Sequence, residues 1–362
     1  MLWITHPRGG LENFRRAAAS GKCTVGYFGG SITDGEARHN WPHFVDHWLA
    51  NRLPGTRIVS ENIALGATGS PIGLMRCKRD YLPRHCDLTF VEFAVNDNGY
   101  PTAYRSRTRE GLLRQLLRSG TTDVVIVYTF MRDFQPFMSR GEMPDSIREF
   151  EELCEHYNLP SVWMSAYTFE MLKRGELRYD EWLPDLLHPQ YAGARLYAKP
   201  VCELLDRELS EENPSRQLSG DHMPEPLNQK HYEQLRLVDW DEVKLDGPFT
   251  VERSDRLGAV SQFLCTSAPG AKITVEFEGT GLLMAEQFGS DTCEYRITVD
   301  GEEQPVNSRE RPAWAGKEGW LRDERLCEDL PFGRHTVTLV TEFPDRPEAT
   351  GILSQIGMFA VV

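Results

Sequence analysis

The sequence lacks the features that would tie it to a membrane or to nucleic acid. No apolar run approaches the roughly 20 residues that span a bilayer, and the first residues lack the basic-then-apolar order of a secretion signal. No run of basic residues occurs, and 40 lysines and arginines stand against 54 aspartates and glutamates, a net charge of −14. Because phosphate groups are bound by clustered cations, we expect no nucleic-acid partner. The lack of an apolar span and of a secretion signal predicts a cytoplasmic protein without a membrane partner.

Cofactor motifs are also missing. None of the 8 cysteines belongs to a Cys-x-x-Cys pair, which argues against a zinc knuckle or a redox motif, and we expect buried thiols. The glycine-rich residues 29–33 are not followed by Gly-Lys-Ser/Thr, so no phosphate-binding loop is indicated. His39, His43 and His47 recur every four residues, and His43 and His47 fall on one helix face, but no third ligand is evident beside that pair. We therefore expect no metal and no cofactor.

The composition is that of an ordinary folded protein in two parts. Hydrophobic residues make up 40% and charged residues 26%, and 362 residues suffice for about two domains. In residues 1–210, short apolar runs alternate with amphipathic stretches. Strands are expected at 24–28, 57–63, 88–95, 123–130 and 161–166, and helices at 41–53, 105–118, 146–157 and 193–209. This alternation predicts an α/β domain with a doubly wound parallel sheet.

The pattern changes after the first domain. Residues 211–235 are polar and irregular, which predicts a linker. Beyond them, apolar and polar residues alternate with a period of two at 272–277, 295–299 and 335–340. Such runs, separated by turn residues, predict an antiparallel, jelly-roll-like β-sandwich domain over 236–362. The sequence leaves open whether this domain binds a glycan, covers a site on the first domain or mediates assembly.

Two segments of the first domain carry the residue types of nucleophilic catalysis. Ser31 directly follows the first expected strand, and ligands of open α/β sheets bind beyond the carboxyl ends of strands. Asp185 and His188 share one tight loop, in which the carboxylate can accept the imidazole Nδ1–H and leave Nε2 to take a proton from a serine. Taken alone, each segment has an alternative interpretation. Ser31 could simply cap the next helix, and Asp185 and His188 could form a loop salt bridge without a catalytic role.

Two further strand ends offer hydrogen-bond donors. Asn96 ends the third expected strand, where its side-chain amide can bind an oxyanion; the alternative is a turn formed by Asn96 and Asp97. Residues 62–69 follow the second strand, and small residues there, Gly66 and Ala67 among them, let backbone N–H groups approach a ligand. The alternative for this segment is a flexible loop.

Taken together and in this order, the four segments resemble the SGNH (GDSL-like) hydrolase superfamily, in a bacterial branch that often acts on acylated glycans. The resemblance rests on Ser31, the region of Gly66 and Ala67, Asn96, and the pair Asp185 and His188. It covers residues 10–209 and implies a flavodoxin-like three-layer α/β/α domain. An α/β-hydrolase elbow fits less well, since it requires Gly-x-Ser-x-Gly and Thr33 occupies the last position.

The resemblance implies acyl transfer by named residues. Ser31 is then the nucleophile, His188 its general base, and Asp185 the residue that orients His188. The backbone N–H groups of Ser31 and Ala67 and the side chain of Asn96 form the implied oxyanion hole. No metal is needed for this chemistry.

Two positions depart from the family pattern. Ala67 occupies the position at which many relatives have the oxyanion-binding glycine, so we assign the donor to Ala67 and keep Gly66 as the alternative. Gly30 stands before the nucleophile, where the family name requires aspartate. Because that aspartate is not part of the proton relay, we interpret Gly30 as a subfamily variant.

Three other residues lie near these segments in the sequence. Trp41 and Trp182 are candidate substrate contacts because aromatic rings pack on sugar faces, although core packing is the alternative that we favour. Glu92 lies in a strand that should be buried, and we expect it to pair with Arg76 or Arg79.

We therefore expect a serine esterase that works through an acyl-enzyme and deacetylates an acylated sugar, either a small molecule or an oligosaccharide ester. One alternative is a lipid or short-chain acyl esterase or a thioesterase, because the same triad would serve each. An alternative of another class is a glycan-binding protein that keeps the SGNH fold without catalysis. The physiological acyl group, the alcohol and the formation of a homo-oligomer stay open.

Overall fold

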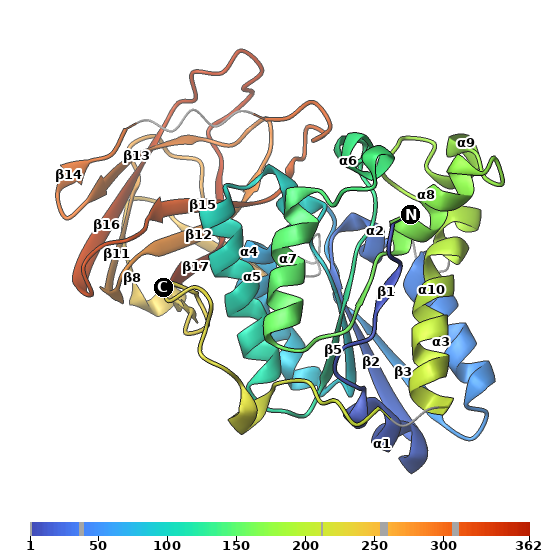
Figure 1. Cartoon of the computed structure of the whole chain (residues 1–362). Helices are drawn as coiled ribbons and strands as arrows, with labels where there is room; N and C mark the ends of the chain where they lie inside the picture. Colours follow the sequence, from blue (N-terminus) through green and yellow to red (C-terminus); the bar gives the residue numbers. More distant parts are fainter. Residues whose placement is uncertain (1, 36–39, 211–212, 254–259, 306–310) are drawn as a thin grey trace. The chain divides into compact units, whose positions relative to one another are not determined.

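The chain forms two compact units, Met1–Glu233 and Gln234–Val362. The computed structural model describes residues 2–35, 40–210, 213–253, 260–305 and 311–362 (Figure 1). Each unit has its own sheets and its own hydrophobic core, and each is described by itself below.

Of the segment predicted as a linker, Gln234 and Leu235 lie in the second unit, and the described residues before them lie in the first unit. Its polar residues make contacts there: Arg114 Nε donates to Glu233 Oε2 at 2.7 Å, and Gln115 Nε2 donates to the Glu233 carbonyl at 2.9 Å. Arg118 also pairs with Glu233. A polar, irregular segment that packs on its own domain has the same composition as a linker in water. The composition of 211–235 therefore predicts a linker, although most of its described residues lie in the first unit.

A mostly parallel sheet forms the centre of the first unit, as the alternation of apolar runs predicted. Its strands are β1 (Thr5–His6), β2 (Lys22–Gly29), β3 (Arg57–Asn62), β4 (Leu88–Glu92), β5 (Asp123–Val127) and β6 (Ser161–Val162). They lie in the order β1-β6-β5-β4-β2-β3, with β1 antiparallel to β6 and the other neighbours parallel. From β2 onward this is the flavodoxin-like order 2-1-3-4-5, in which ligands bind beyond the carboxyl ends of the strands at the point where the order reverses.

Helices cover both faces of this sheet, which gives the three layers implied by the family resemblance. The longer ones are α1 (Glu12–Ser20), α3 (Trp41–Arg52), α4 (Ser70–Arg76), α5 (Thr102–Leu117), α7 (Asp145–His156), α8 (Met164–Lys173) and α10 (Tyr191–Ser210). In Figure 1, α4, α5 and α7 lie on one face of the sheet, and α3, α8 and α10 lie on the other. The expected strand at 161–166 is wrong beyond Val162, because the chain turns there into the unpredicted helix α8.

The second unit is an antiparallel β-sandwich, as its period-two alternation predicted. One sheet has the order β15-β12-β17-β10-β9, with β7 beside β17, and the other has the order β14-β13-β16-β11-β8. The strands are β7 (Arg236–Leu237), β8 (Val243–Asp246), β9 (Thr250–Arg253), β10 (Gln262–Thr266), β11 (Lys272–Gly279), β12 (Leu282–Phe288), β13 (Glu294–Val299), β14 (Glu302–Glu303), β15 (Trp320–Cys327), β16 (Gly333–Glu342) and β17 (Ser354–Val361).

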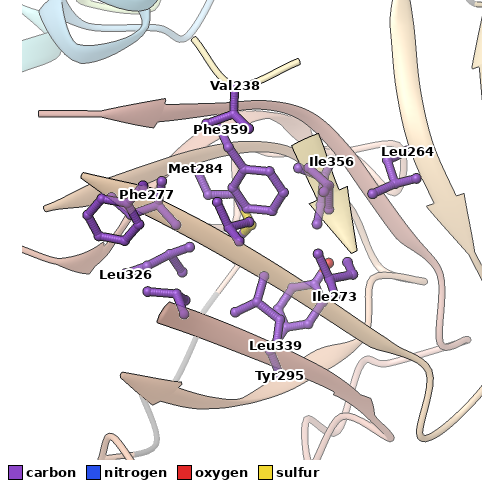
Figure 2. Packing of buried hydrophobic residues seen from close by; sticks show 14 of the residues in the cluster. Val238, Leu264, Ile273, Phe277, Met284, Tyr295, Leu326, Leu339, Ile356 and Phe359 are labelled. Atoms are coloured by element: carbon purple, nitrogen blue, oxygen red, sulfur yellow. The ribbon is translucent and has the colours of Figure 1, made fainter. Parts of the chain in front are cut away.

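Alternate residues of these strands point between the two sheets and form the core of the second unit. On β11, Ile273, Val275 and Phe277 are buried, and the residues between them are more exposed. Figure 2 shows Ile273 and Phe277 packed in one cluster with Met284 and Phe359 from the facing sheet. Because side chains of a strand point alternately to its two faces, a period of two in the sequence becomes one apolar face per sheet.

Two further properties concern the whole chain. Among the described helices, none is both long and apolar enough to cross a membrane. All eight cysteines are free thiols, with Cys202 and Cys327 half-buried and the others buried. Burial raises the pKa of Cys86 to about 11, so this thiol is protonated and unreactive at neutral pH.

Candidate active site

Ser31 lies at the carboxyl end of β2, at the start of the one-turn helix α2 (Ser31–Asp34). Gly30 links the strand to this turn, and a Cβ at position 30 would overlap the Asn96 side-chain oxygen. A larger side chain at position 30 would displace Asn96 from its present position, which is a physical reason for the departure from the aspartate of the family motif. The Asn96 side chain therefore lies directly beside the residue that precedes Ser31.

The structure brings Ser31, His188 and Asp185 into one hydrogen-bonded line. Ser31 Oγ lies 2.9 Å from His188 Nε2, and His188 Nδ1 lies 2.7 Å from Asp185 Oδ2. The other carboxylate oxygen, Oδ1, accepts the backbone N–H groups of Leu187 at 3.0 Å and His188 at 2.7 Å. One oxygen of Asp185 therefore shapes the loop while the other orients the imidazole, which leaves Nε2 for the serine.

The loop that carries Asp185 and His188 is open to solvent. The side chain of His188 is 44% exposed and that of Asp185 is 55% exposed. Partial burial opposes ionisation of Asp185, but the hydrogen bonds from His188 and Leu187 outweigh it and hold the pKa of this carboxyl below its ordinary value. Asp185 is therefore ionised at neutral pH and stabilises a protonated His188.

Asn96 and the loop after β3 lie beside the nucleophile. β4 ends at Glu92, so the expected strand to residue 95 is too long, and Asn96 begins a 3-10 turn, Asn96–Gly99. In the loop, the Gly66 N–H donates to Asp34 Oδ2 at 3.0 Å. The Ala67 N–H meets no acceptor within the described part of the chain, and Ala67 has a left-handed φ of 60°. Of the two alternatives, Ala67 thus has the amide that is left to bind a ligand.

A buried ion pair between Asp97 and Arg109, which the sequence analysis did not predict, holds the turn that begins at Asn96. Asp97 is fully buried; its Oδ2 accepts from Arg109 Nε at 2.6 Å, and its Oδ1 accepts the Ser70 N–H at 2.8 Å. Arg109 also donates to the Ser146 carbonyl at 2.8 Å and to the Ser146 hydroxyl at 2.7 Å. The pair ties the turn after β4 to α4, α5 and α7. Arg109 is one of four arginines on α5, and nothing in the sequence marks it as the partner of Asp97.

Glu92 pairs with neither Arg76 nor Arg79, which corrects the expectation. Arg76 Nε contacts Asp80 at 3.1 Å and Arg79 Nε contacts Asp80 at 2.6 Å. Glu92 is fully buried and accepts hydrogen bonds from the hydroxyls of Thr33 at 3.1 Å and Thr129 at 2.8 Å. Burial raises the pKa of Glu92 to about 7, against the effect of these donors. Its carboxyl joins the turn after β2 to the end of β5.

Trp41 and Trp182 are core residues, as the favoured interpretation predicted, and not the substrate contacts for which they were candidates. Both side chains are completely buried. Trp41 donates from Nε1 to the Thr33 hydroxyl at 3.2 Å, and the Trp182 ring packs 4.9 Å from that of Phe130. Neither indole has a face free for a sugar. Trp41 instead supports the nucleophile turn through Thr33.

The histidines on α3 form no recognisable metal site. The rings of His43 and His47 lie 4.1 Å apart, and His39 lies outside the described residues. In the ranges that the structure describes, no three histidine, cysteine, aspartate or glutamate side chains gather as metal ligands do.

The flavodoxin-like sheet order and the serine, histidine and aspartate aligned at its carboxyl edge are those of a serine ester hydrolase. Residues 27–196, which lie within the N-terminal unit, match the model of the GDSL-like Lipase/Acylhydrolase family. No curated protein sequence is significantly similar to the chain.

Two solved structures resemble nearly the whole chain. A two-domain esterase (CEX) active on acetylated mannans, co-crystallized with mannopentaose, has a TM-score of 0.82 at 23% identity, covering 99% of this chain and 96% of its own. A second structure of a two-domain esterase with the same description, without the oligosaccharide, has a TM-score of 0.84 at 23% identity, with 99% and 97% covered. At this identity the likeness shows that the two-domain fold is shared.

Proposed function

We propose that this chain is a serine esterase that deacetylates an acylated sugar or oligosaccharide through an acyl-enzyme. The observation that carries the proposal is the line from Ser31 Oγ through His188 to Asp185, with separations of 2.9 Å and 2.7 Å. These are hydrogen-bond distances, so the serine has a base within reach and the base has an orienting carboxylate.

Acylation begins with proton transfer from the Ser31 hydroxyl to His188 Nε2 while Oγ bonds to the ester carbonyl carbon. Asp185 keeps the proton on Nδ1 and stabilises the imidazolium. His188 then gives its Nε2 proton to the sugar oxygen as the ester C–O bond breaks. The sugar leaves with a free hydroxyl, and the acetyl group stays on Ser31.

Deacylation repeats these steps with water. His188 takes a proton from the water as its oxygen attacks the acetyl carbon, and Ser31 Oγ recovers the proton when acetate leaves. In both halves the carbonyl oxygen becomes negative. The donors that we assign to it are the N–H groups of Ser31 and Ala67 and the side-chain amide of Asn96.

Two observations support a sugar ester over a long-chain lipid ester. His188 and Asp185 are about half exposed, which suits an alcohol too large to be enclosed. The chain also shares its two-domain fold with esterases described as active on acetylated mannans. Polymeric and oligomeric substrates need an open approach to the nucleophile, whereas fatty acyl chains need an apolar tunnel.

The test begins with p-nitrophenyl acetate. The wild-type protein is expected to release a burst of p-nitrophenol, and Ser31→Ala is expected to lose turnover by roughly 10⁴-fold or more because no other hydroxyl replaces the nucleophile. Ser119→Ala, on the exposed surface, is the matched control and should leave turnover unchanged. Turnover retained by Ser31→Ala would contradict the proposal.

The substrate class is tested by comparing p-nitrophenyl esters of increasing chain length with acetylated oligosaccharides. We expect kcat/KM to fall beyond acetyl and to be highest on acetylated oligosaccharides. A rise toward octanoyl esters would indicate a lipid esterase. A protein that resists fluorophosphonate labelling, and whose glycan affinity is the same in Ser31→Ala, would be a glycan-binding protein without catalysis.

A further inference from the structure

Asp34 is an acidic residue next to a site where negative charge is expected to develop, and the mechanism above does not use it. It ends α2, three residues after Ser31, and its side chain is half-buried. Burial raises the pKa of the Asp34 carboxyl, and the hydrogen bond from Gly66 acts in the opposite direction. A carboxylate close to a forming oxyanion opposes it by Coulomb repulsion, so its presence there calls for a compensating role.

The backbone around Asp34 is held from two other segments. Asn40 Nδ2 donates to the Asp34 carbonyl at 2.8 Å and to the Thr33 carbonyl at 2.7 Å. Asn62 Nδ2, at the end of β3, donates to the same Thr33 carbonyl at 2.9 Å. The Asp34 N–H donates to the Gly30 carbonyl at 2.9 Å. The carboxylate therefore projects from a fixed turn.

That carboxylate holds the loop after β3. Asp34 Oδ2 accepts the Gly66 N–H at 3.0 Å. A Cβ added to Gly66 would lie 3.5 Å from Asp34 Oδ2 and 3.8 Å from the Ser31 Cβ, so the loop passes beside the nucleophile. The Leu65 N–H donates to the Gly29 carbonyl at 3.0 Å, which fixes the loop on its other side.

The next amide along this loop is the one assigned to the oxyanion. Ala67 has a φ of 60°, a left-handed conformation that costs a non-glycine residue about 1–2 kcal/mol. Such a conformation persists only where the surroundings impose it. The hydrogen bond from Gly66 to Asp34 occupies the first of two successive backbone N–H groups. The second, on Ala67, remains available to a ligand.

We propose that Asp34 is a positioning residue of the oxyanion-binding loop: by accepting the Gly66 N–H it sets the strained conformation that presents the Ala67 N–H to the reacting carbonyl. The proposal rests on the proposed esterase function. Because the role of Asp34 is that of a hydrogen-bond acceptor, the neutral amide of asparagine should fill it, and without adding charge beside the oxyanion.

The test compares Asp34→Ala with the matched variant Asp34→Asn in the full chain, using p-nitrophenyl acetate. Asp34→Ala is expected to lower kcat roughly 10- to 100-fold with KM unchanged, because a misplaced donor weakens binding only in the transition state. Asp34→Asn is expected to stay within about threefold of wild type, because its Oδ1 accepts the Gly66 N–H. Circular dichroism and thermal melting establish that both variants fold.

Each outcome decides the proposal. Asp34→Ala with wild-type kcat would overturn it, and so would an equal loss in both variants, which would point to charge rather than to the hydrogen bond. A raised KM at unchanged kcat would overturn it in favour of direct substrate contact. If Asp34→Ala does not fold, Asp34→Ser replaces it, since its shorter side chain withdraws the acceptor. Ser31→Ala tests the esterase function separately, because it is inactive only if Ser31 is the nucleophile. This variant therefore distinguishes failure of the Asp34 proposal from failure of the proposed esterase function.

Discussion

At the scale of single residues, the site depends on carboxyl groups whose roles differ because their surroundings differ. Asp185 is half exposed and takes hydrogen bonds from His188 and from backbone N–H groups, which lower its pKa. Glu92 is fully buried among threonine hydroxyls, and burial raises its pKa to about 7. Asp185 is therefore ionised at neutral pH, whereas Glu92 titrates near neutral pH.

Glu92 makes a pH-dependent contribution to stability that Glu92→Gln should remove. Because its pKa is higher in the folded state than the ordinary value of 4.5, the folded protein holds a proton that the unfolded chain releases. Stability conferred by this proton is present at low pH and is lost as the pH rises from about 4.5 through about 7. The free energy of unfolding of wild type relative to Glu92→Gln should therefore fall by roughly 3 kcal/mol over this range.

The measurement is urea unfolding of both proteins at about pH 4 and about pH 8. Glu225→Gln, at an exposed position, serves as the control and should track the wild type at both pH values. If wild type and Glu92→Gln keep a constant difference in stability across the range, Glu92 does not titrate there.

At the scale of elements, the site is made where the turn after β2 meets the turn after β4. The register of the sheet places Gly29 opposite Glu92, so both strands end at the same level. Asn96 then lies against Gly30, and the buried pair of Asp97 and Arg109 holds the second turn. Neither turn is shaped by its own sequence alone.

Gly30→Ala should impair catalysis through Asn96. The added methyl group overlaps the Asn96 side-chain oxygen and displaces that side chain. Since loss of one oxyanion donor costs on the order of 10²-fold in turnover, we expect Gly30→Ala and Asn96→Ala each to reduce kcat by about that factor. The kcat of the double variant should lie within about threefold of the kcat of Asn96→Ala, because the added methyl group then has no Asn96 side chain to displace.

This double-mutant cycle is measured with p-nitrophenyl acetate, and thermal melting monitors folding of each variant. Multiplicative losses in the double variant would mean that Gly30→Ala acts on Ser31 directly and not through Asn96.

At the scale of the whole molecule, each unit has a separate hydrophobic core. Ile273 is fully buried between the sheets of the second unit, whereas Leu245, its register partner on the neighbouring strand β8, is 42% exposed. Two cores of this kind predict two thermal transitions. The location in the cytoplasm stays a prediction, and the formation of a homo-oligomer stays open.

Ile273→Ala should lower the free energy of unfolding of the second unit by about 2–5 kcal/mol, because it leaves a cavity between the sheets. Leu245→Ala, the surface control, should change it by less than about 0.5 kcal/mol. Differential scanning calorimetry should show one transition moving and the other staying in place. A single transition that shifts as a whole would mean that the two units unfold together.

The sequence by itself determined the fold class, the sandwich and the order of the catalytic segments. Apolar periodicity dictates which faces are buried, and strand ends carry the site in a doubly wound sheet. Ser31 and Asn96 could be selected because they follow strands, and Asp185 and His188 because of their spacing in one loop. The resemblance to the SGNH superfamily combined the four residues, and the structure brings them to one site.

Only the tertiary structure decided which neighbours these residues meet. In the folded chain Trp41 and Trp182 are buried, and Glu92 accepts hydrogen bonds from threonine hydroxyls. The Gly66 N–H donates to Asp34, which leaves the Ala67 N–H available to a ligand. Such contacts join residues that are distant in the chain, and their geometry follows from sheet register and packing, to which no local periodicity is sensitive.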